Sequence, residues 1–323
     1  MNAVFSSVRS KLFLLPLIAH VLSVGVVWAQ APNAEISSSQ ARVARDLEVI
    51  RIGEQQHVPP ARQAALWEQL ASQYEIGTDF LKAEDAYLRA LHLLKTAPSA
   101  RAEYAFTLDN LSSLYIIYRR LDDAESARKQ AIKVRQKLGN PAETGQSEVH
   151  LADIALMRRQ YDKAERLALQ ALQMMESSLN PPRAGILSAF IALTFARCSR
   201  GHCGEGLMNA KQAVTFANKN FESESAANGL ALESLGFAEW KSGASQDAGK
   251  TLLQALQILR TRLSATDPRL AGVMSQYRSY LIEAHRPADA QEIEKQLIRI
   301  TSQAGVYCQG CTVSVGSLSS TLR

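Results

Sequence analysis

The chain has 323 residues, of which 46% are hydrophobic and 21% are charged, and its formal net charge is +5 at pH 7. No strong local stripe of Lys or Arg accompanies the mild basic excess, so the sequence predicts no nucleic-acid partner.

The N-terminus has the three parts of an export signal. Arg9 and Lys11 give a positive start, residues 12–27 are almost wholly apolar, and the tripeptide ending at Ala29 has the small-x-small pattern of a cleavage site. We therefore expect a signal peptide over residues 1–29 and export to the periplasm or the exterior, which lowers the net charge from +5 to +3. An uncleaved anchor helix is the alternative, but the apolar run of 16 residues is shorter than the roughly 20 that a span needs. No second apolar segment predicts a stable membrane span after cleavage.

Residues 30–60 begin as a polar linker and continue as one predicted helix. The helix starts near residues 37–39, where serines can cap it, and it ends before the two prolines that close this segment. Val43, Leu47 and Ile50 form its apolar stripe. We interpret this helix as a cap over the exposed end of the helices that follow. A degenerate additional repeat is the alternative.

The segment from residue 67 to residue 90 is the unit on which the rest of the chain is built. Apolar and small residues at i, i+3, i+4 and i+7 predict its first helix: Trp67, Leu70, Ala71 and Tyr74. Gly77 then breaks that helix, because glycine tolerates the backbone of a tight turn. The second helix has its own face of recurring positions: Ala83, Tyr87 and Ala90.

Small residues recur in register along the chain, at spacings of 41, 40, 42, 42 and 42. The positions equivalent to Ala83 are Ala83, Ala124, Ala164, Gly206, Ala248 and Ala290. Seven residues further on stand Ala90, Ala131, Ala171, Ala213, Ala255 and Leu297. A fixed period of 20–50 residues is the signature of stacked repeats, in which each helix pair buries its apolar face against its neighbours.

The unit resembles the tetratricopeptide repeat (TPR), whose pattern is W-x2-L-G-x2-Y followed by an alanine and an aromatic. Trp67-x2-Leu70-Ala71-x2-Tyr74 matches that pattern with alanine in place of glycine. The period is longer than the 34 residues of the common form. It is similar to the roughly 42-residue variety of kinesin light chains and many bacterial proteins.

The resemblance implies an all-α fold, a right-handed α-α superhelical solenoid of about six helix-turn-helix units over residues 61–304. The pattern is strong in the first two units and weak in the fourth and sixth. Residues 305–323 are rich in Gly, Ser and Thr and lose helical periodicity, so we expect a flexible tail. A short ordered segment packed on the last unit is the alternative.

The resemblance also implies a binding groove, because in TPR proteins the first helix of each pair lines the concave face. Placing each unit's first residue at positions 64, 105, 145, 187, 229 and 271 puts its second, fifth, ninth and twelfth residues inward. The side chains that we expect to form the groove are Glu68, Glu75, Asp109, Asp153, Ile191, Phe195, Leu230, Glu233, Phe237 and Trp240. Five are acids and none is basic, while the later positions are apolar and suit peptide anchors. The alternative is that the aromatic residues belong to the core and the acids are merely solvated.

The four cysteines fall into two local pairs, Cys198 with Cys203 and Cys308 with Cys311. In an exported chain an even number of cysteines favours disulfides, and pairing within each local set is the simplest arrangement. A redox-active C-x2-C motif needs a strand before and a helix after it, and that context is missing. A zinc site that uses all four cysteines, with or without His202, is the remaining alternative.

No motif for catalysis or for a cofactor appears. Phosphate loops, dinucleotide fingerprints, HExxH and nucleophile elbows are absent, so we expect no enzyme activity, no cofactor and no bound metal. The sequence predicts a protein-interaction scaffold that binds an extended, basic or apolar segment of a protein partner. A self-associating component of an exported assembly, and hence a homo-oligomer, is the alternative. Redox or metal chemistry at the cysteines is a third hypothesis.

Overall fold

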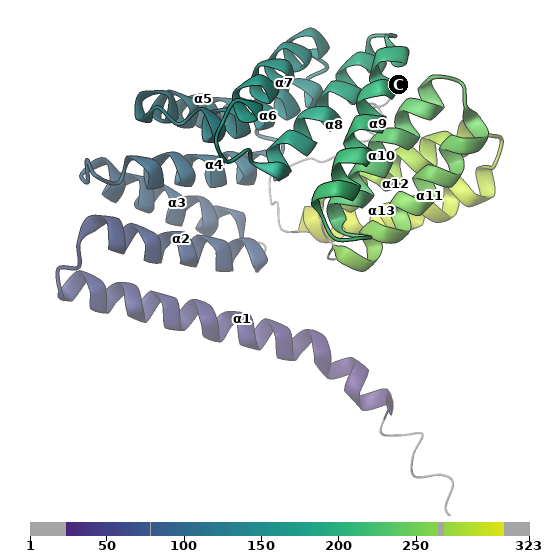
Figure 1. The fold of residues 1–323 in the computed structure, drawn as a ribbon. Helices are drawn as coiled ribbons and strands as arrows, with labels where there is room; N and C mark the ends of the chain where they lie inside the picture. The colour runs from purple at the N-terminus through teal and green to yellow at the C-terminus, as the bar shows by residue number, and fades with distance from the viewer. Residues whose placement is uncertain (1–23, 78, 264–267, 307–323) are drawn as a thin grey trace, which may run out of the picture.

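The computed structural model describes residues 24–77, 79–263 and 268–306, which form thirteen helices and no strand within those ranges. After α1 (Val24–Gln55) the helices come in six antiparallel pairs that follow one another around an arc (Figure 1). The pairs are α2 (Pro60–Ile76) with α3 (Phe80–Lys95), α4 (Arg101–Ile117) with α5 (Leu121–Leu138), α6 (Pro141–Met157) with α7 (Tyr161–Glu176), α8 (Arg183–Ser199) with α9 (Cys203–Asn220), α10 (Ala226–Lys241) with α11 (Ser245–Arg262), and α12 (Pro268–Glu283) with α13 (Pro287–Val306).

α1 packs against α2 at the N-terminal end of the arc (Figure 1). The side chain of Gln63 donates to the Ile50 carbonyl at 3.1 Å, and that of Gln69 donates to Asp46 at 2.8 Å. Ile50 is buried as predicted, but Leu47 is 43% exposed, so the predicted stripe is only partly right. The helix also begins at Val24, before the predicted start at residues 37–39, so the predicted polar linker is helical as well.

Local sequence signals set several helix ends. The Asp79 side chain accepts from the backbone N–H of Lys82 at the start of α3, and Asn140 caps α6 in the same way. Ser225 and Asn228 form a reciprocal capping box at the start of α10. Gly139 ends α5 in the left-handed conformation with φ +68°, which glycine adopts without steric cost.

The recurring small residues lie where the two helices of a pair meet. Each of the alanines at positions 83, 124, 164 and 248 is fully buried, and Ala290 is 4% exposed. Gly206 replaces alanine in α9, where an added Cβ would lie 2.5 Å from the Sγ of Cys198 on α8. The small side chains therefore allow close approach of the paired backbones, and larger residues such as Leu70 and Leu193 fill the space beside them.

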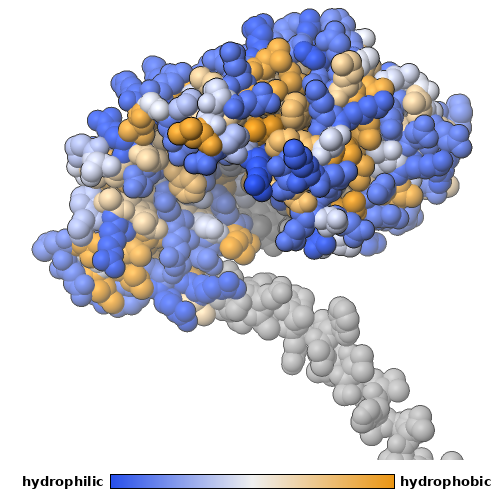
Figure 2. Space-filling model, viewed as in Figure 1, coloured by the Kyte–Doolittle hydropathy of each residue, from blue (hydrophilic) through white to orange (hydrophobic). Residues whose placement is uncertain are grey.

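The first helices α6, α8 and α10 contact one another in succession along the inner side of the arc, whereas α2 and α4 contact each other little. α8 contacts both α6 and α10, whereas neighbouring second helices such as α5 and α7 make few contacts with each other. The first helices thus line the concave face and the second helices lie on the outside. Figure 2 shows the molecule hollowed on one face, between its N-terminal repeats and its C-terminal repeats.

Ion pairs join repeats one to four in succession, near the turns within the helix pairs. In repeats one to three, a glutamate directly follows the recurring alanine of the second helix. Each glutamate pairs with arginine at or just after the end of the next repeat's first helix: Glu84 with Arg120, Glu125 with Arg158, and Glu165 with Arg197 and Arg200. The Nη1 of Arg120 lies 2.9 and 2.8 Å from the two oxygens of Glu84. Such charge-assisted contacts orient one repeat on the next.

Candidate functional site

The concave face is the candidate binding surface, and its predicted inward positions differ greatly in exposure. Ala65, Ser72, Ser113, Phe106 and Ile282 are exposed, the last two at 54% and 51%. They come from α2, α4 and α12. The face therefore carries separate apolar side chains among small polar ones, and its predicted acids are mostly engaged with other parts of the chain.

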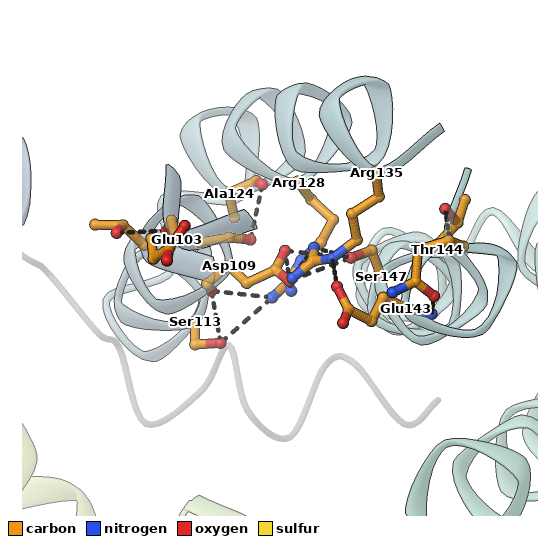
Figure 3. Close-up of polar contacts among 12 residues, drawn as sticks. Glu103, Asp109, Ser113, Ala124, Arg128, Arg135, Glu143, Thr144 and Ser147 are labelled. Carbon is orange, nitrogen blue, oxygen red and sulfur yellow. Dashed lines mark hydrogen bonds and ion pairs between the residues drawn. The ribbon is translucent and has the colours of Figure 1, made fainter. Parts of the chain in front are cut away.

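Asp109 on α4 lies inside an ion-pair network and is not a free groove acid (Figure 3). Arg128 and Arg135 of α5 contact its two carboxylate oxygens, with N–O distances of 2.6 and 2.5 Å. The Ser147 hydroxyl donates to Asp109 at 3.2 Å, and Arg135 also reaches Glu143 at 3.2 Å. Two guanidinium groups are thus balanced by two carboxylates, and this part of the face is electrically neutral.

Arg128 is the most deeply buried charge of this network, with a side chain only 2% exposed. It also donates to the Asp109 carbonyl at 3.2 Å and to the Ser113 hydroxyl at 3.3 Å. Burial lowers the pKa of its guanidinium, and Asp109 opposes that effect. Removing either partner would leave an uncompensated buried charge, so the pair holds α4 and α5 together.

Glu68 and Glu75 on α2 are half-buried and each accepts a hydrogen bond from a neighbouring hydroxyl. The Thr107 hydroxyl of α4 donates to Glu68, and Tyr87 of α3 donates to Glu75. Desolvation raises the pKa of both carboxyl groups, and these hydrogen bonds lower it. Both side chains join adjacent helices, so neither is a free anionic site for a ligand.

The two remaining predicted acids contrast with each other. Asp153 on α6 has a side chain 45% exposed, and the Nδ1 of His150 lies 3.6 Å from its carboxylate. Glu233 on α10 is 7% exposed and accepts from Gln276 of α12 at 2.9 Å. Burial raises the pKa of Glu233 to about 8, so the group is largely protonated at neutral pH. Asp153 alone of the five remains an accessible carboxylate.

The prediction that Phe237 and Trp240 are exposed in the groove is wrong. Phe237 is 4% exposed and Trp240 is 7% exposed, and both belong to the core of repeats four to six. The ring of Phe237 lies 4.8 Å from that of Phe195 on α8, because α8 and α10 approach closely there. Phe195, like Ile191 and Leu230, is half-buried and packs against core clusters. These three keep part of their apolar surface on the inner side.

The sequence did not lead us to Arg128 and Arg135, which form ion pairs with Asp109. They stand seven residues apart on α5, on the same side as buried Ala131. Charged residues at helix positions that share a face with buried alanines indicate a buried counter-charge opposite. That signal was present in the sequence and could have paired them with Asp109.

Cys198 and Cys203 form a disulfide across the turn between α8 and α9, as predicted, with Cα atoms 4.1 Å apart. Cys308 and Cys311 lie outside the described residues, so their predicted pairing stays a prediction. Within the described ranges no group of three or more His, Cys, Asp or Glu side chains could hold a metal ion. In the same part of the chain, no helix combines the length and apolar character needed to cross a membrane.

The sequence matches no protein-family model and no curated protein. Among solved structures, the apo form of RapI is similar with a TM-score of 0.65 at 12% identity, covering 84% of this chain and 97% of that one. The fold is that of a TPR-like helical solenoid. A Rap protein complexed with Competence and Sporulation Factor gives a TM-score of 0.52 at 13% identity, covering 88% and 85% of the two chains.

A putative kinesin light chain with TPR-like repeats from Podosopora anserina is also similar, with a TM-score of 0.51 at 18% identity. It covers 62% of this chain and 96% of that one. The predicted resemblance to TPR proteins, kinesin light chains among them, is therefore confirmed at the level of the fold. Identities this low establish the fold alone.

Proposed function

We propose that this chain is an exported, non-enzymatic scaffold that binds an extended segment of a partner protein along its concave face. The observation that carries the proposal is the inner surface of the first helices. Single exposed apolar side chains, Phe106 and Ile282, and the half-buried Phe195 stand on it at separate points, with small polar residues between them. Spaced apolar anchors on a rigid curved face suit an extended peptide.

The partner segment is mainly apolar, with a basic group that lies opposite Asp153. Asp109, Glu68 and Glu75 already have partners within the chain and add little net negative charge. The Rap protein of similar fold that is complexed with Competence and Sporulation Factor supports a binding role for this architecture. It says nothing of the ligand of this chain.

Export to an oxidising compartment is part of the proposal. It is supported by the apolar N-terminal signal in the sequence and by the disulfide between Cys198 and Cys203, since such bonds persist outside the reducing cytosol. N-terminal sequencing of the protein recovered from the periplasm or the medium should begin at Gln30. A full-length chain retained in the cytoplasm would contradict this part of the proposal.

The test is affinity capture from crosslinked extract of the export compartment, with the native chain and a concave-face variant as baits. The variant carries Phe106→Ser, Asp153→Lys and Ile282→Ser, three changes at exposed or half-exposed positions of α4, α6 and α12. Phe237, Trp240 and Asp109 are left unchanged, because substituting them would damage the core and the ion-pair network. A partner captured by the native chain should bind the variant at least tenfold more weakly, or about 1.4 kcal/mol.

The matched control carries Leu88→Ser, Met208→Ser and Glu176→Lys, which change exposed positions of the second helices α3, α9 and α7. It has the same changes of polarity and charge on the outside of the arc. The control should keep full binding, with an unchanged thermal midpoint for all three proteins. Equal loss in both variants, or loss in neither, would refute the concave-face assignment. Recovery of only the chain itself from every bait would favour self-association instead.

A further inference from the structure

The turns within the helix pairs of repeats one and two carry a group of exposed apolar side chains, which we call the turn patch. Its members are Ile76 at the end of α2, Leu81 at the start of α3 and Ile117 at the end of α4, with exposed fractions of 63%, 73% and 48%. Both turns lie at the ends of α2 and α4 that point towards the C-terminal repeats (Figure 1). Single exposed apolar residues are common, but a group of them on neighbouring turns indicates an interaction surface.

The two turns are in direct contact, so the members of the patch lie on one surface. The ring of Phe80, directly before Leu81, lies 4.0 Å from the ring of Tyr118, directly after Ile117. The guanidinium of Arg120 lies 5.6 Å from the Phe80 ring. Phe80 is itself only 8% exposed. These buried contacts hold the two turns at a fixed distance and give the patch a rigid base.

The fold does not require apolar side chains at these positions. The residues equivalent to Ile76 and Ile117 in repeats three to six are Met157, Ser199, Lys241 and Glu283. The residues equivalent to Leu81 in repeats two to six are Asp122, Asp162, Gly204, Gln246 and Ala288. Polar or small residues therefore serve the turn equally well in most repeats, and the apolar side chains of repeats one and two are not there for packing within the chain.

An arginine occupies the left-handed backbone position of the turns in repeats two and three. Arg119 has φ +61° and Arg159 has φ +57°. Repeats four and five have Gly201 and Gly243 there at φ +86°, and repeat six has His285 at φ +55°. Glycine adopts this conformation without steric cost, whereas a residue with a Cβ is strained in it. Two repeats thus hold a guanidinium group at a backbone position that favours glycine.

Neither arginine has a carboxylate partner among the residues that the structure describes. The carboxylates of these turns already pair with other cations: Asp79 with Lys82, Asp123 with Arg120, and Asp122 with Arg158. Arg119 follows Ile117 by two residues, so one of the two positive charges stands at the patch itself and the other at the next turn. Positive charges without an internal counter-charge favour an acidic ligand.

We propose that the turn patch binds an acidic segment of a partner protein that carries two or more large apolar side chains. The apolar side chains of the segment cover the patch, and its carboxylates pair with Arg119 and Arg159. The site differs from the concave face, whose accessible charge is the carboxylate of Asp153. The chain thus offers two surfaces for segments of opposite charge, and either proposal can fail without the other.

Other occupants fit these charges less well. A second copy of the chain, docked patch to patch, would bring Arg119 close to the same residue of the other copy, and like charges oppose that contact. Residues 307–323 of this chain contain no Asp or Glu, so they cannot neutralise the arginines. An anionic membrane would meet Asp122, whose side chain is 96% exposed at the position equivalent to Leu81.

The test is selection from a random dodecapeptide display library, with the full mature chain as bait. A patch variant with Leu81→Ser, Ile117→Ser and Arg119→Glu serves for counter-selection, and it leaves Phe106, Asp153 and Ile282 of the concave face in place. Peptides that bind the native chain and not the variant should carry net negative charge and at least two large apolar residues. Patch-dependent peptides with net positive charge would overturn the proposal. So would the absence of any patch-dependent peptide with a Kd below roughly 1 mM.

Isothermal titration of the strongest selected peptide then separates its two kinds of contact. Changing its acidic residues to Asn and Gln, or its apolar residues to Ser, should each weaken binding about tenfold or more. The matched control chain carries Leu88→Ser, Leu138→Ser and Arg101→Glu, at exposed positions away from these turns, and it should bind as the native chain does. Equal weakening by the control and by the patch variant would refute the assignment.

Glycine at the two arginine positions distinguishes a binding role from a structural one. The double variant Arg119→Gly and Arg159→Gly should weaken the peptide severalfold but melt no lower than the native chain, because glycine relieves the left-handed strain. Unchanged peptide binding would remove both arginines from the site. Sedimentation with phosphatidylglycerol vesicles provides the remaining comparison, in which native chain and patch variant should both stay in solution. Vesicle binding that the patch variant loses would overturn the proposal in favour of a lipid surface.

Discussion

The N-terminal and C-terminal repeats use the inner positions of their first helices in different ways. On α4 the inner positions carry Phe106, which is 54% exposed, and Asp109, which is tied to two arginines of α5. On α10 the inner positions carry Phe237 and Trp240, which are buried. The difference follows from helix spacing, since α2 and α4 contact each other little, whereas α8 contacts both α6 and α10 closely. A position that lines a groove at one end of a solenoid can therefore belong to the core at the other.

The largest expected effect is the difference in stability loss between alanine substitutions at Phe237 and at Phe106. Phe237→Ala should destabilise the chain by about 3–5 kcal/mol, because it removes a buried ring and leaves a cavity beside Phe195. Phe106→Ala should change stability by no more than about 0.5 kcal/mol, because the ring is more than half exposed. Urea denaturation measures both values. Similar losses for the two variants would show that the two ends of the inner face are built alike.

The ion-pair network at Asp109 gives an effect of similar size by another mechanism. Asp109→Ala should cost about 3–5 kcal/mol, because it leaves Arg128 buried without its carboxylate. Adding Arg128→Met to the same chain should restore part of that loss, since the uncompensated charge is gone. Asp153→Ala, at a half-exposed carboxylate of α6, is the control and should be nearly neutral. A double variant less stable than Asp109→Ala would contradict this interpretation.

How much of this structure the sequence could predict depends on what kind of signal each residue carries. The alanines at positions 83, 124 and 164 repeat at nearly constant spacing, so they predicted the helix pairs and their contact faces. The resemblance to TPR proteins, applied in that register, also assigned the inner positions of the first helices. Whether an inner residue is exposed depends on how closely neighbouring first helices approach, and periodicity holds no information on that distance. Phe237 and Trp240 were therefore misjudged, whereas the local pairing of Cys198 with Cys203 was predictable from five residues of separation.

The pH dependence of stability should differ in sign between Glu233 of the C-terminal repeats and Glu125 of the N-terminal repeats. Glu233 ionises near 4.5 when the chain is unfolded, but burial in the folded chain raises its pKa to about 8. Between these pH values the folded state holds a proton that the unfolded state has lost, so stability falls as pH rises, by up to about 1.4 kcal/mol per pH unit. Glu233→Gln should remove this slope. The difference in melting temperature between variant and native chain should be small at pH 4.5 and should grow in favour of the variant towards pH 8.

Glu125 on α5 should show the opposite sign. Desolvation opposes the shift, but hydrogen bonds and attraction from Lys129 and Lys163 lower the pKa of Glu125 to about 2, against an unfolded value of 4.5. This stabilisation is fully present above pH 4.5 and is lost as pH falls towards 2. Glu125→Gln should therefore be less stable than the native chain at pH 7, and that difference should shrink in acid. Parallel pH profiles for the two variants would refute the contrast between a buried neutral acid and an ion-paired one.

The smallest expected effect on stability comes from removing the disulfide between Cys198 and Cys203 in repeat four. Replacing Cys198 and Cys203 by alanine together should cost about 2 kcal/mol, because the bond closes a loop of only a few residues.

Gly206→Ala tests the same contact from α9, since its added Cβ would lie 2.5 Å from the Cys198 Sγ. In the native chain that overlap should cost about 1–3 kcal/mol. In the cysteine-free chain the cost should fall, because the sulfur is absent and the position should accept the alanine that five other repeats carry. Equal costs in both backgrounds would mean that the α8 backbone, and not the sulfur, requires glycine in repeat four.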